Sequence, residues 1–225
     1  MDDTYILNIE TSTKACSLSL NLNGNLISCE DIVGSGFSHS EKLLLFISQT
    51  IEKSKIKMSD LSAVAISMGP GSFTGLRIGV STAKGICYAL GIPLIAVSTL
   101  QAMAFGMAKK IKSELYCPMI DARRMEVYAA FYDLENNLVR KIQADIVNES
   151  SYLDFLDKEV VFFGDGSLKI KEIIKHKKAT FVSDFHPSAK FIGDLSYEKF
   201  RNSDFVDVAY FEPYYLKDFV GGKKA

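Results

Sequence analysis

The segment from residue 61 to residue 97 constrains the fold more than any other part of the chain. Residues 61–68 are a short apolar run, residues 73–90 have helical periodicity, and residues 93–97 are a second apolar run. A strand, a helix and a strand in this order form a crossover connection, which places the two strands parallel in one sheet. The sequence therefore predicts an α/β protein.

The residues before this crossover predict antiparallel strands and a helix. Asn23-Gly24 lies between two apolar or alternating runs and is a strong hairpin-turn signal. Residues 40–53 carry apolar side chains at helical spacing. We expect a meander of three strands ahead of this helix, at residues 5–9, 15–22 and 26–33.

The second half of the chain repeats the order of strands first and helices later. A helix is expected at residues 100–111, strands at 116–121, 127–132, 139–147 and 160–163, and helices at 168–176 and 188–200. We therefore expect two lobes, residues 1–112 and residues 113–225, with the C-terminal tail able to return to the first lobe. The glycine- and lysine-rich residues 221–225 should fray.

Composition and charge exclude several classes of protein. The formal net charge of −1 argues against a protein that binds nucleic acid by itself, because such proteins carry a basic surplus. No apolar run reaches the roughly 18 residues of a membrane span, and the start Met1-Asp2-Asp3 is unlike a secretory signal. The four cysteines form no C-x-x-C pair and are expected to be reduced. The expectation is a cytoplasmic protein with no membrane contact.

The most distinctive segment is the loop between the first strand and the helix of the crossover. Free backbone N–H groups and the helix dipole favour an anion at such a place. The loop lacks the Gly-Lys-Ser/Thr of a P-loop, and its glycines do not have the dinucleotide-binding spacing. Two interpretations stay open. Gly69, Gly71 and Ser72 contact a phosphate, or the glycines make a tight turn and Ser72 caps the helix.

A second candidate is the end of the first strand, which reads Glu10-Thr11-Ser12. A carboxylate beside hydroxyls can hold a hydrated magnesium ion and the phosphate oxygens of a nucleotide. The alternative is that these hydroxyls satisfy backbone groups of a turn. The three histidines are far apart in the sequence and no G-x-S-x-G elbow is present, so we assign no metal ligand and no catalytic residue.

Several of these segments together resemble the bacterial TsaB (YeaZ) family. The matching stretches are residues 6–12, 39–44, 69–79, 83–85, 97–100 and 212–216. The resemblance implies an actin-like (ASKHA) fold of two ribonuclease-H-like lobes, without a bound cofactor. It also implies that a metal site is missing, because Thr99 and Met103 stand where TsaD-like relatives carry a metal-binding pair of histidines.

The two helices of the first half indicate a surface for a partner. They carry more apolar surface than one sheet can cover, and small residues spaced by four let another helix come close. The opposite interpretation is that the rest of the lobe covers these faces. We predict that the partner-facing residues are Leu45, Phe46, Gly75, Gly79 and Ala83.

The resemblance implies a non-catalytic scaffold in the synthesis of threonylcarbamoyladenosine on tRNA. It implies pairing with a TsaD-like catalytic subunit that transfers the threonylcarbamoyl group to N6 of the adenosine next to the anticodon. It further implies docking of a TsaE-like ATPase, a homodimer when the chain is alone, and indirect contact with tRNA. The alternative is an actin-like ATP-binding enzyme, an ATPase or transferase acting on its own at residues 10–12 and 69–72. An endopeptidase has neither a metal pair nor a catalytic triad to support it.

Overall fold

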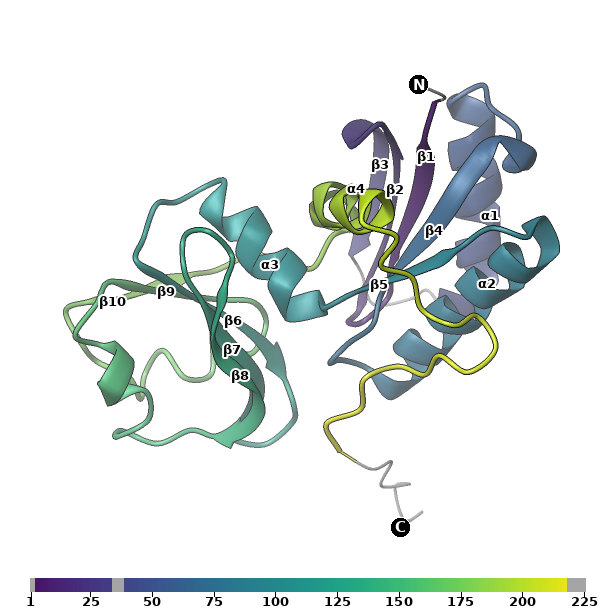
Figure 1. Ribbon diagram of the computed structural model, residues 1–225. Coiled ribbons are helices and arrows are strands. Elements are labelled where there is room, and N and C mark those ends of the chain that lie inside the picture. The colour runs from purple at the N-terminus through teal and green to yellow at the C-terminus, as the bar shows by residue number, and fades with distance from the viewer. Residues whose placement is uncertain (1–2, 34–38, 218–225) are drawn as a thin grey trace, which may run out of the picture.

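A computed structural model of the chain describes residues 3–33 and 39–217. Within these residues the chain forms two lobes, each built on one sheet of five strands, and α3 (Thr99–Ala108) runs between them (Figure 1). The predicted α/β class is confirmed. The predicted fraying at residues 221–225 lies outside the described residues.

The first lobe is a mixed sheet in the order β3-β2-β1-β4-β5. Its first three strands are antiparallel, whereas β1, β4 and β5 are parallel, so the predicted meander and crossover are both confirmed. The helices α1 and α2 lie together on one face of this sheet (Figure 1). The bounds are β1 Tyr5–Glu10, β2 Ala15–Leu22, β3 Asn25–Val33, α1 His39–Lys53, β4 Leu61–Ser67, α2 Phe73–Leu90 and β5 Leu94–Val97.

The small-residue stripe of α2 faces the chain's own sheet. Gly75, Gly79 and Ala83 are all buried, and a Cβ atom added at Gly79 would lie 2.2 Å from Thr11 Oγ1 and 3.0 Å from Ile66 Cδ1. Small residues are needed here because α2 lies close against the ends of β1 and β4. The prediction that these three residues meet a partner is therefore wrong.

The second lobe is a mixed sheet in the order β10-β9-β6-β7-β8. The neighbours β6, β9 and β10 are parallel, and β6, β7 and β8 are antiparallel. The four predicted strands are confirmed, and β10 is an additional strand. The bounds are β6 Leu115–Asp121, β7 Glu126–Tyr132, β8 Leu138–Ile146, β9 Val160–Phe163 and β10 Ala179–Val182.

The helix predicted at residues 168–176 is wrong. This segment is a series of tight turns, in which Ile170 N donates to Ser167 O and Ile173 N donates to Ile170 O. Gly166 lies so close to β6 that an added Cβ would be 2.9 Å from the carbonyl carbon of Ile120. The buried Ile170 and Ile174 have helical spacing, but the close approach to the sheet favours turns.

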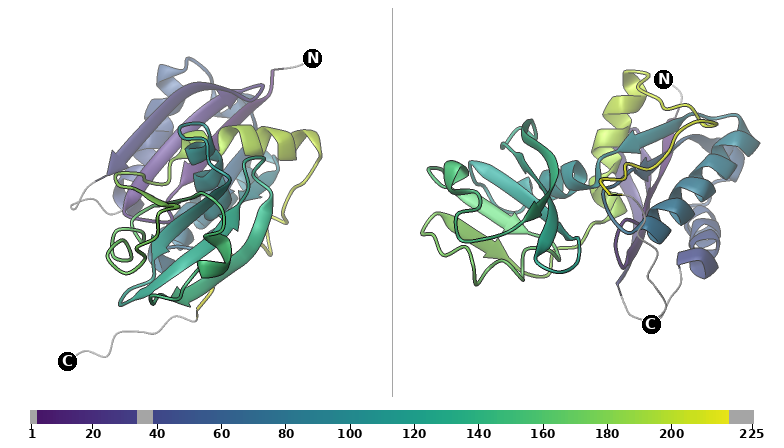
Figure 2. Two further views of the ribbon diagram at one scale, coloured as in Figure 1. Left: turned by 90° about the vertical axis from the view of Figure 1, so that its left-hand side faces the viewer. Right: turned by 90° about the horizontal axis from the view of Figure 1, so that it is seen from below.

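After β10 the chain returns to the first sheet. The short helix at Ala189–Phe191 and α4 (Gly193–Arg201) pack on the face opposite α1 and α2, which is turned toward the second lobe (Figures 1 and 2). Ser196 Oγ of α4 donates a 2.7 Å hydrogen bond to Asn8 Oδ1 of β1, and both side chains are buried. Residues 188–201, which the sequence analysis placed with the second lobe, thus lie on the first sheet.

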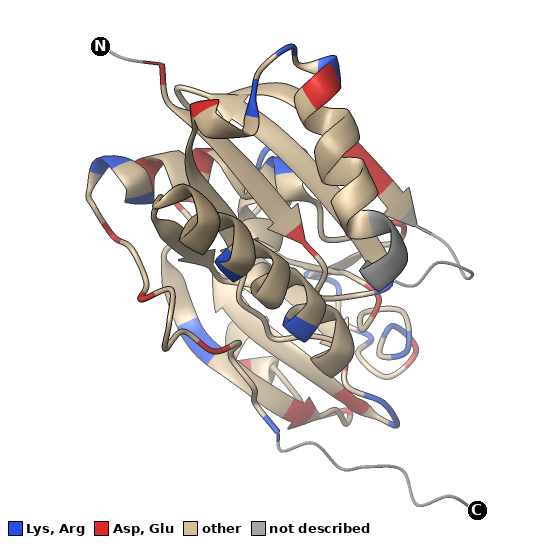
Figure 3. Cartoon of the chain, turned by 90° about the vertical axis from the view of Figure 1, so that its right-hand side faces the viewer, with Lys and Arg blue, Asp and Glu red and all other residues tan. Residues whose placement is uncertain are grey.

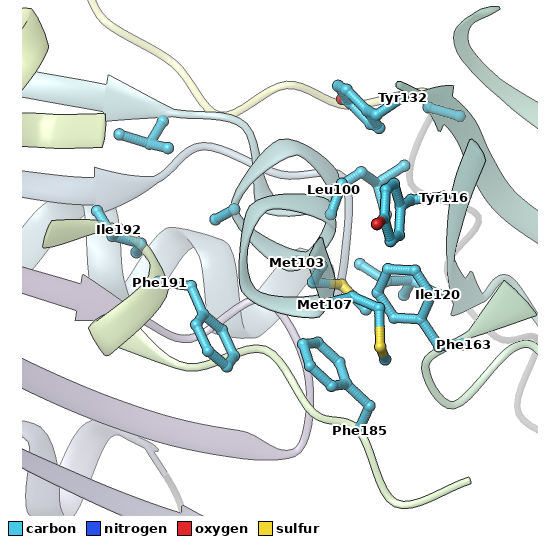
Figure 4. Packing of buried hydrophobic residues seen from close by; sticks show 14 of the residues in the cluster. Leu100, Met103, Met107, Tyr116, Ile120, Tyr132, Phe163, Phe185, Phe191 and Ile192 are labelled. Atoms are coloured by element: carbon cyan, nitrogen blue, oxygen red, sulfur yellow. The ribbon is translucent and has the colours of Figure 1, made fainter. Parts of the chain in front are cut away.

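One hydrophobic cluster passes through both lobes. Met103 and Met107 of α3 pack against Tyr116 and Phe163 of the second sheet, and the cluster continues to Ile6 of the first sheet. Figure 4 shows the methionine side chains of α3 turned toward the second sheet, with Phe185 of the returning segment near them and the Phe191 ring 5.2 Å from that of Phe185. The two lobes therefore share a core instead of meeting through polar surfaces.

Candidate functional site

Glu10 lies at the centre of the candidate site. It is the last residue of β1, and Ser67 ends the neighbouring parallel strand β4, so the two side chains meet at the same edge of the sheet. Glu10 Oε1 accepts hydrogen bonds from Ser12 N at 2.6 Å and from Ser67 Oγ at 2.9 Å. The Glu10 side chain is 1% exposed, so these donors replace water at one of its oxygens only.

Burial raises the pKa of Glu10, and the hydrogen bonds from Ser12 and Ser67 oppose this shift. Three polar oxygens in the same place are buried with no hydrogen-bond partner among the described residues. They are Glu10 Oε2, Thr11 Oγ1 and Ser12 Oγ, which we call the Glu10 cluster. Burying a polar atom without a partner costs free energy, so this cluster is a feature that needs an explanation.

The glycine loop, residues 69–72, packs directly against the cluster. Ser72 N donates a 2.6 Å hydrogen bond to Ser12 O, and a Cβ atom added at Gly71 would lie 2.2 Å from the same oxygen. Ser72 also caps α2, because its Oγ accepts a hydrogen bond from Gly75 N at 3.3 Å. The structure therefore brings Glu10, Ser12, Gly71 and Ser72 together, and the space that Gly71 leaves is filled by the chain itself.

Gly69 has a different neighbour. Its φ of +109° lies in the region that favours glycine, and an added Cβ would be 2.8 Å from Tyr214 O of the C-terminal segment. Its carbonyl oxygen accepts a 3.1 Å hydrogen bond from Thr99 N at the start of α3. These contacts agree with the turn interpretation of the loop, and the phosphate contact predicted for Gly69, Gly71 and Ser72 stays a prediction.

Thr99 and Met103, which the resemblance places where TsaD-like relatives carry metal-binding histidines, are core residues. Thr99 is fully buried and Met103 is 1% exposed within the cluster shared by both lobes. Among residues 3–33 and 39–217, no group of three or more His, Cys, Asp or Glu side chains is arranged to hold a metal ion. A hydroxyl and a thioether are weak ligands for zinc or iron, so these side chains do not fit such a metal.

The outer face of α1 and α2 exposes apolar side chains. Leu44 is 63% exposed, Leu45 is 54% exposed and Tyr88 is 86% exposed, whereas Phe46 is half-buried against the first-lobe core. Gly85 lies on this face with no atom within 4 Å of an added Cβ. Leu44 and Tyr88 were missed as candidates, although Tyr88 follows the polar residue Lys84 by four positions and so lies on the same side of the helix. We call Leu44, Leu45, Gly85 and Tyr88 the helix-pair surface.

The helix α2 carries few charged residues. Figure 3 shows α1 and α2 next to each other, with two basic positions along α2 and no acidic one. The two basic residues are Arg77 and Lys84. None of the described helices is long and apolar enough to cross a membrane. An exposed apolar face on a helix pair is typical of a protein–protein contact.

Solved structures show which fold this is. The chain is similar to YeaZ from Pseudomonas aeruginosa, with a TM-score of 0.84 and 24% sequence identity over 95% of this chain and all of that chain. A second structure, described as an uncharacterized protein with similarity to peptidase YEAZ from the same organism, matches with a TM-score of 0.81 over the same share. With the two sheets, this likeness defines an α/β protein with the actin-like fold of two lobes.

Comparison with known protein families identifies the family of this chain. A family model described as TsaD, tRNA N6-adenosine threonylcarbamoyltransferase, matches residues 36–210. A protein named tRNA threonylcarbamoyladenosine biosynthesis protein TsaB from Escherichia coli K12 is 30% identical over 97% of each chain. Its namesake from Bacillus subtilis 168 is 32% identical over 76% of this chain and 75% of its own. The chain belongs to the TsaB/YeaZ family, as its motifs predict.

Proposed function

We propose that this chain is a non-catalytic scaffold subunit in the synthesis of threonylcarbamoyladenosine on tRNA. It pairs with a TsaD-like catalytic subunit, and supports that subunit while it transfers the threonylcarbamoyl group to N6 of the adenosine next to the anticodon. The family membership supports the pathway, because the curated relatives are named biosynthesis proteins of this tRNA modification. The work of the chain is then cytoplasmic, and its contact with tRNA is indirect.

The observation that carries the scaffold role is the helix-pair surface. Two adjacent helices expose Leu44, Leu45 and Tyr88 by more than half of their surface. An interface of standard size buries about 1,600 Å² in total, and aromatic anchors such as Tyr88 dominate the binding energy of such interfaces. Gly85 leaves room for a partner helix to approach α2 closely. A TsaD-like subunit is the proposed partner, a second copy replaces it when the chain is alone, and a TsaE-like ATPase docks on the pair.

Two observations support a subunit without catalysis of its own. The described residues lack a metal-binding cluster, and the two positions where TsaD-like relatives carry histidines hold the buried Thr99 and Met103. An actin-like catalytic site also needs room for a ligand between the glycine loop and β1. That space is occupied by the contact between Gly71 and Ser12.

Charged substitution of the surface tests the pairing. The chain is mixed with the TsaD-like protein of the same source, and the mass of the complex is measured by light scattering. We expect Leu45→Asp and Tyr88→Asp each to weaken pairing at least about 30-fold, because a central interface residue contributes about 2 kcal/mol or more. Leu138→Asp is the matched control, since Leu138 is 51% exposed on β8 of the other lobe. Equal complex formation by all three variants refutes the proposed surface.

The second candidate function is an actin-like enzyme that uses ATP at the Glu10 cluster. The unpartnered Glu10 Oε2, Thr11 Oγ1 and Ser12 Oγ favour it, because a bound ion or phosphate would supply the missing partners. Calorimetry with Mg-ATP on the isolated chain distinguishes the two functions. Micromolar binding with turnover supports the enzyme, and a titration without heat supports the scaffold.

A further inference from the structure

The C-terminal segment runs as an extended strap across the first lobe. We call residues 206–217 the C-terminal strap. At its start, Val206 N donates a 2.9 Å hydrogen bond to the carbonyl oxygen of Leu94, the first residue of β5. Lys84 Nζ of α2 then donates to two carbonyl oxygens of the strap, those of Ala209 and Phe211, at 2.9 and 3.1 Å. At this point the Lys84 side chain of α2 holds the backbone of the strap, and Val206, Val208 and Phe211 of the strap pack against the first-lobe core.

The strap next crosses the glycine loop. Tyr214 N donates a 2.7 Å hydrogen bond to Met68 O, the residue immediately before the loop. The carbonyl oxygen of Tyr214 occupies the space beside Gly69, where an added Cβ would be only 2.8 Å away. The loop is thus enclosed from two sides, by Ser12 at Gly71 and by the strap at Gly69.

The end of the strap is fastened to both lobes. The Tyr215 ring lies 5.0 Å from the Phe73 ring at the start of α2, and Arg77 Nε donates a 3.3 Å hydrogen bond to Tyr215 Oη. The Arg77 guanidinium also lies 3.9 Å from the centre of the Phe73 ring. Two residues further on, Lys217 forms an ion pair with Glu126 of β7 in the second lobe. The strap therefore spans from the edge of the first sheet to the second sheet.

We propose that the C-terminal strap is a latch that keeps the glycine loop closed over the Glu10 cluster. The path of contact is continuous. Tyr214 packs on Gly69, and the loop carries Gly71 onto Ser12, whose N–H is bonded to the Glu10 carboxylate. While the strap is in place, the three unpartnered oxygens of the cluster are sealed from water and solutes. Release of the strap opens them.

The fastenings suit a latch that can open. The side chain of Lys217 is 42% exposed, and ion pairs at the surface contribute little to stability. Arg77 and Tyr215 meet at the surface as well. The first half of the strap packs on the first-lobe core, so the part held by few exposed contacts is its end, residues 212–217. Segments held in this way open locally at a lower free energy than the whole fold. The Glu10 cluster, by contrast, lies between two strand ends of the core sheet and cannot open without the loop.

Hydrogen–deuterium exchange of the full-length chain tests the latch. The variant combines Arg77→Ala with Glu126→Gln, which removes the contacts to Tyr215 and Lys217. We expect the amides of residues 68–76 to exchange at least about 10-fold faster than in the unmodified chain. The amides of β8 in the second lobe should be unchanged, and they report any global loss of stability.

A control variant and a shortened chain complete the test. Lys53→Gln removes an exposed ion pair with Glu30 of β3, the edge strand opposite β5, and it should leave exchange of the loop unchanged. A chain that ends after residue 205 lacks the strap completely and should show the faster exchange at residues 68–76 even if the double variant does not. Slow exchange of the loop in that shortened chain, with β8 still protected, overturns the proposal.

Discussion

Two glycines in α2 invite the same substitution with opposite expected outcomes. Gly79 and Gly85 both lie within the helix, so replacing either with alanine adds the same methyl group and the same gain in helix propensity, about 1 kcal/mol. At Gly85 the methyl group meets open space. At Gly79 it would lie 2.2 Å from Thr11 Oγ1 and 3.0 Å from Ile66 Cδ1.

The difference between the two variants isolates the packing cost. Both variants gain the same helix propensity, so this gain does not contribute to the difference between them. Forcing an extra methyl group into a filled core costs typically 1–3 kcal/mol. Thr11 is fully buried and has a short side chain, so it cannot move aside freely. We expect Gly85→Ala to stabilise the chain by about 0.5–1 kcal/mol and to exceed Gly79→Ala in stability by about 2 kcal/mol.

Urea unfolding followed by circular dichroism measures this difference. With a slope of about 2–3 kcal/mol per molar urea for a chain of this size, the midpoints should differ by roughly 0.7–1 M, with Gly79→Ala the lower. If Gly79→Ala is as stable as Gly85→Ala, then Gly79 does not pack against β1 and the internal position of the small-residue stripe is refuted.

Three further outcomes are expected. Burial raises the pKa of Glu10 above its value in the unfolded chain, so the folded chain loses stability as the pH rises from the unfolded-state pKa to the folded-state pKa. Glu10→Gln should therefore be more stable than the unmodified chain at pH 7, and the difference should shrink on acidification through this window. Ser196→Ala leaves the buried Asn8 Oδ1 without this donor and should cost about 1–3 kcal/mol in urea unfolding; a cost near zero would contradict the packing of α4 on β1. Burial raises the pKa of Cys16 and Cys87 to about 11, which leaves about 100-fold less thiolate at pH 8 than an ordinary cysteine has, so both should be alkylated rapidly only in denaturant. Fast labelling of either thiol in the folded chain would contradict its burial.

Local patterns predicted most of the elements in this fold. The turn at Asn23-Gly24 and the crossover from β4 to β5 were predictable because their signals lie within a few residues of each other. The helix predicted at residues 168–176 failed because Ile170 and Ile174 have helical spacing while Gly166 holds the chain close to β6. That contact comes from tertiary packing. The β10 strand was missed although Thr180 and Val182 are β-branched.

The sequence predicts which residues form the candidate site better than it predicts what surrounds them. The ends of parallel strands meet at one edge, which brings Glu10 to the glycine loop. The buried side of α2 includes Gly79, which lies close to Thr11, and small residues allow such an approach to a sheet as well as to a partner. The contact between Tyr214 and Gly69 joins positions far apart in the chain, and no local pattern reveals it.

The return of the chain to its first sheet has a consequence for synthesis on the ribosome. Asn8 is made well before Ser196, which covers it, because the whole second sheet lies between them in the chain. Until α4 leaves the exit tunnel, one face of the first sheet stays uncovered, and its apolar residues are open to chaperones or to misfolding. The N-terminal strands must therefore be protected through the production of the whole second lobe.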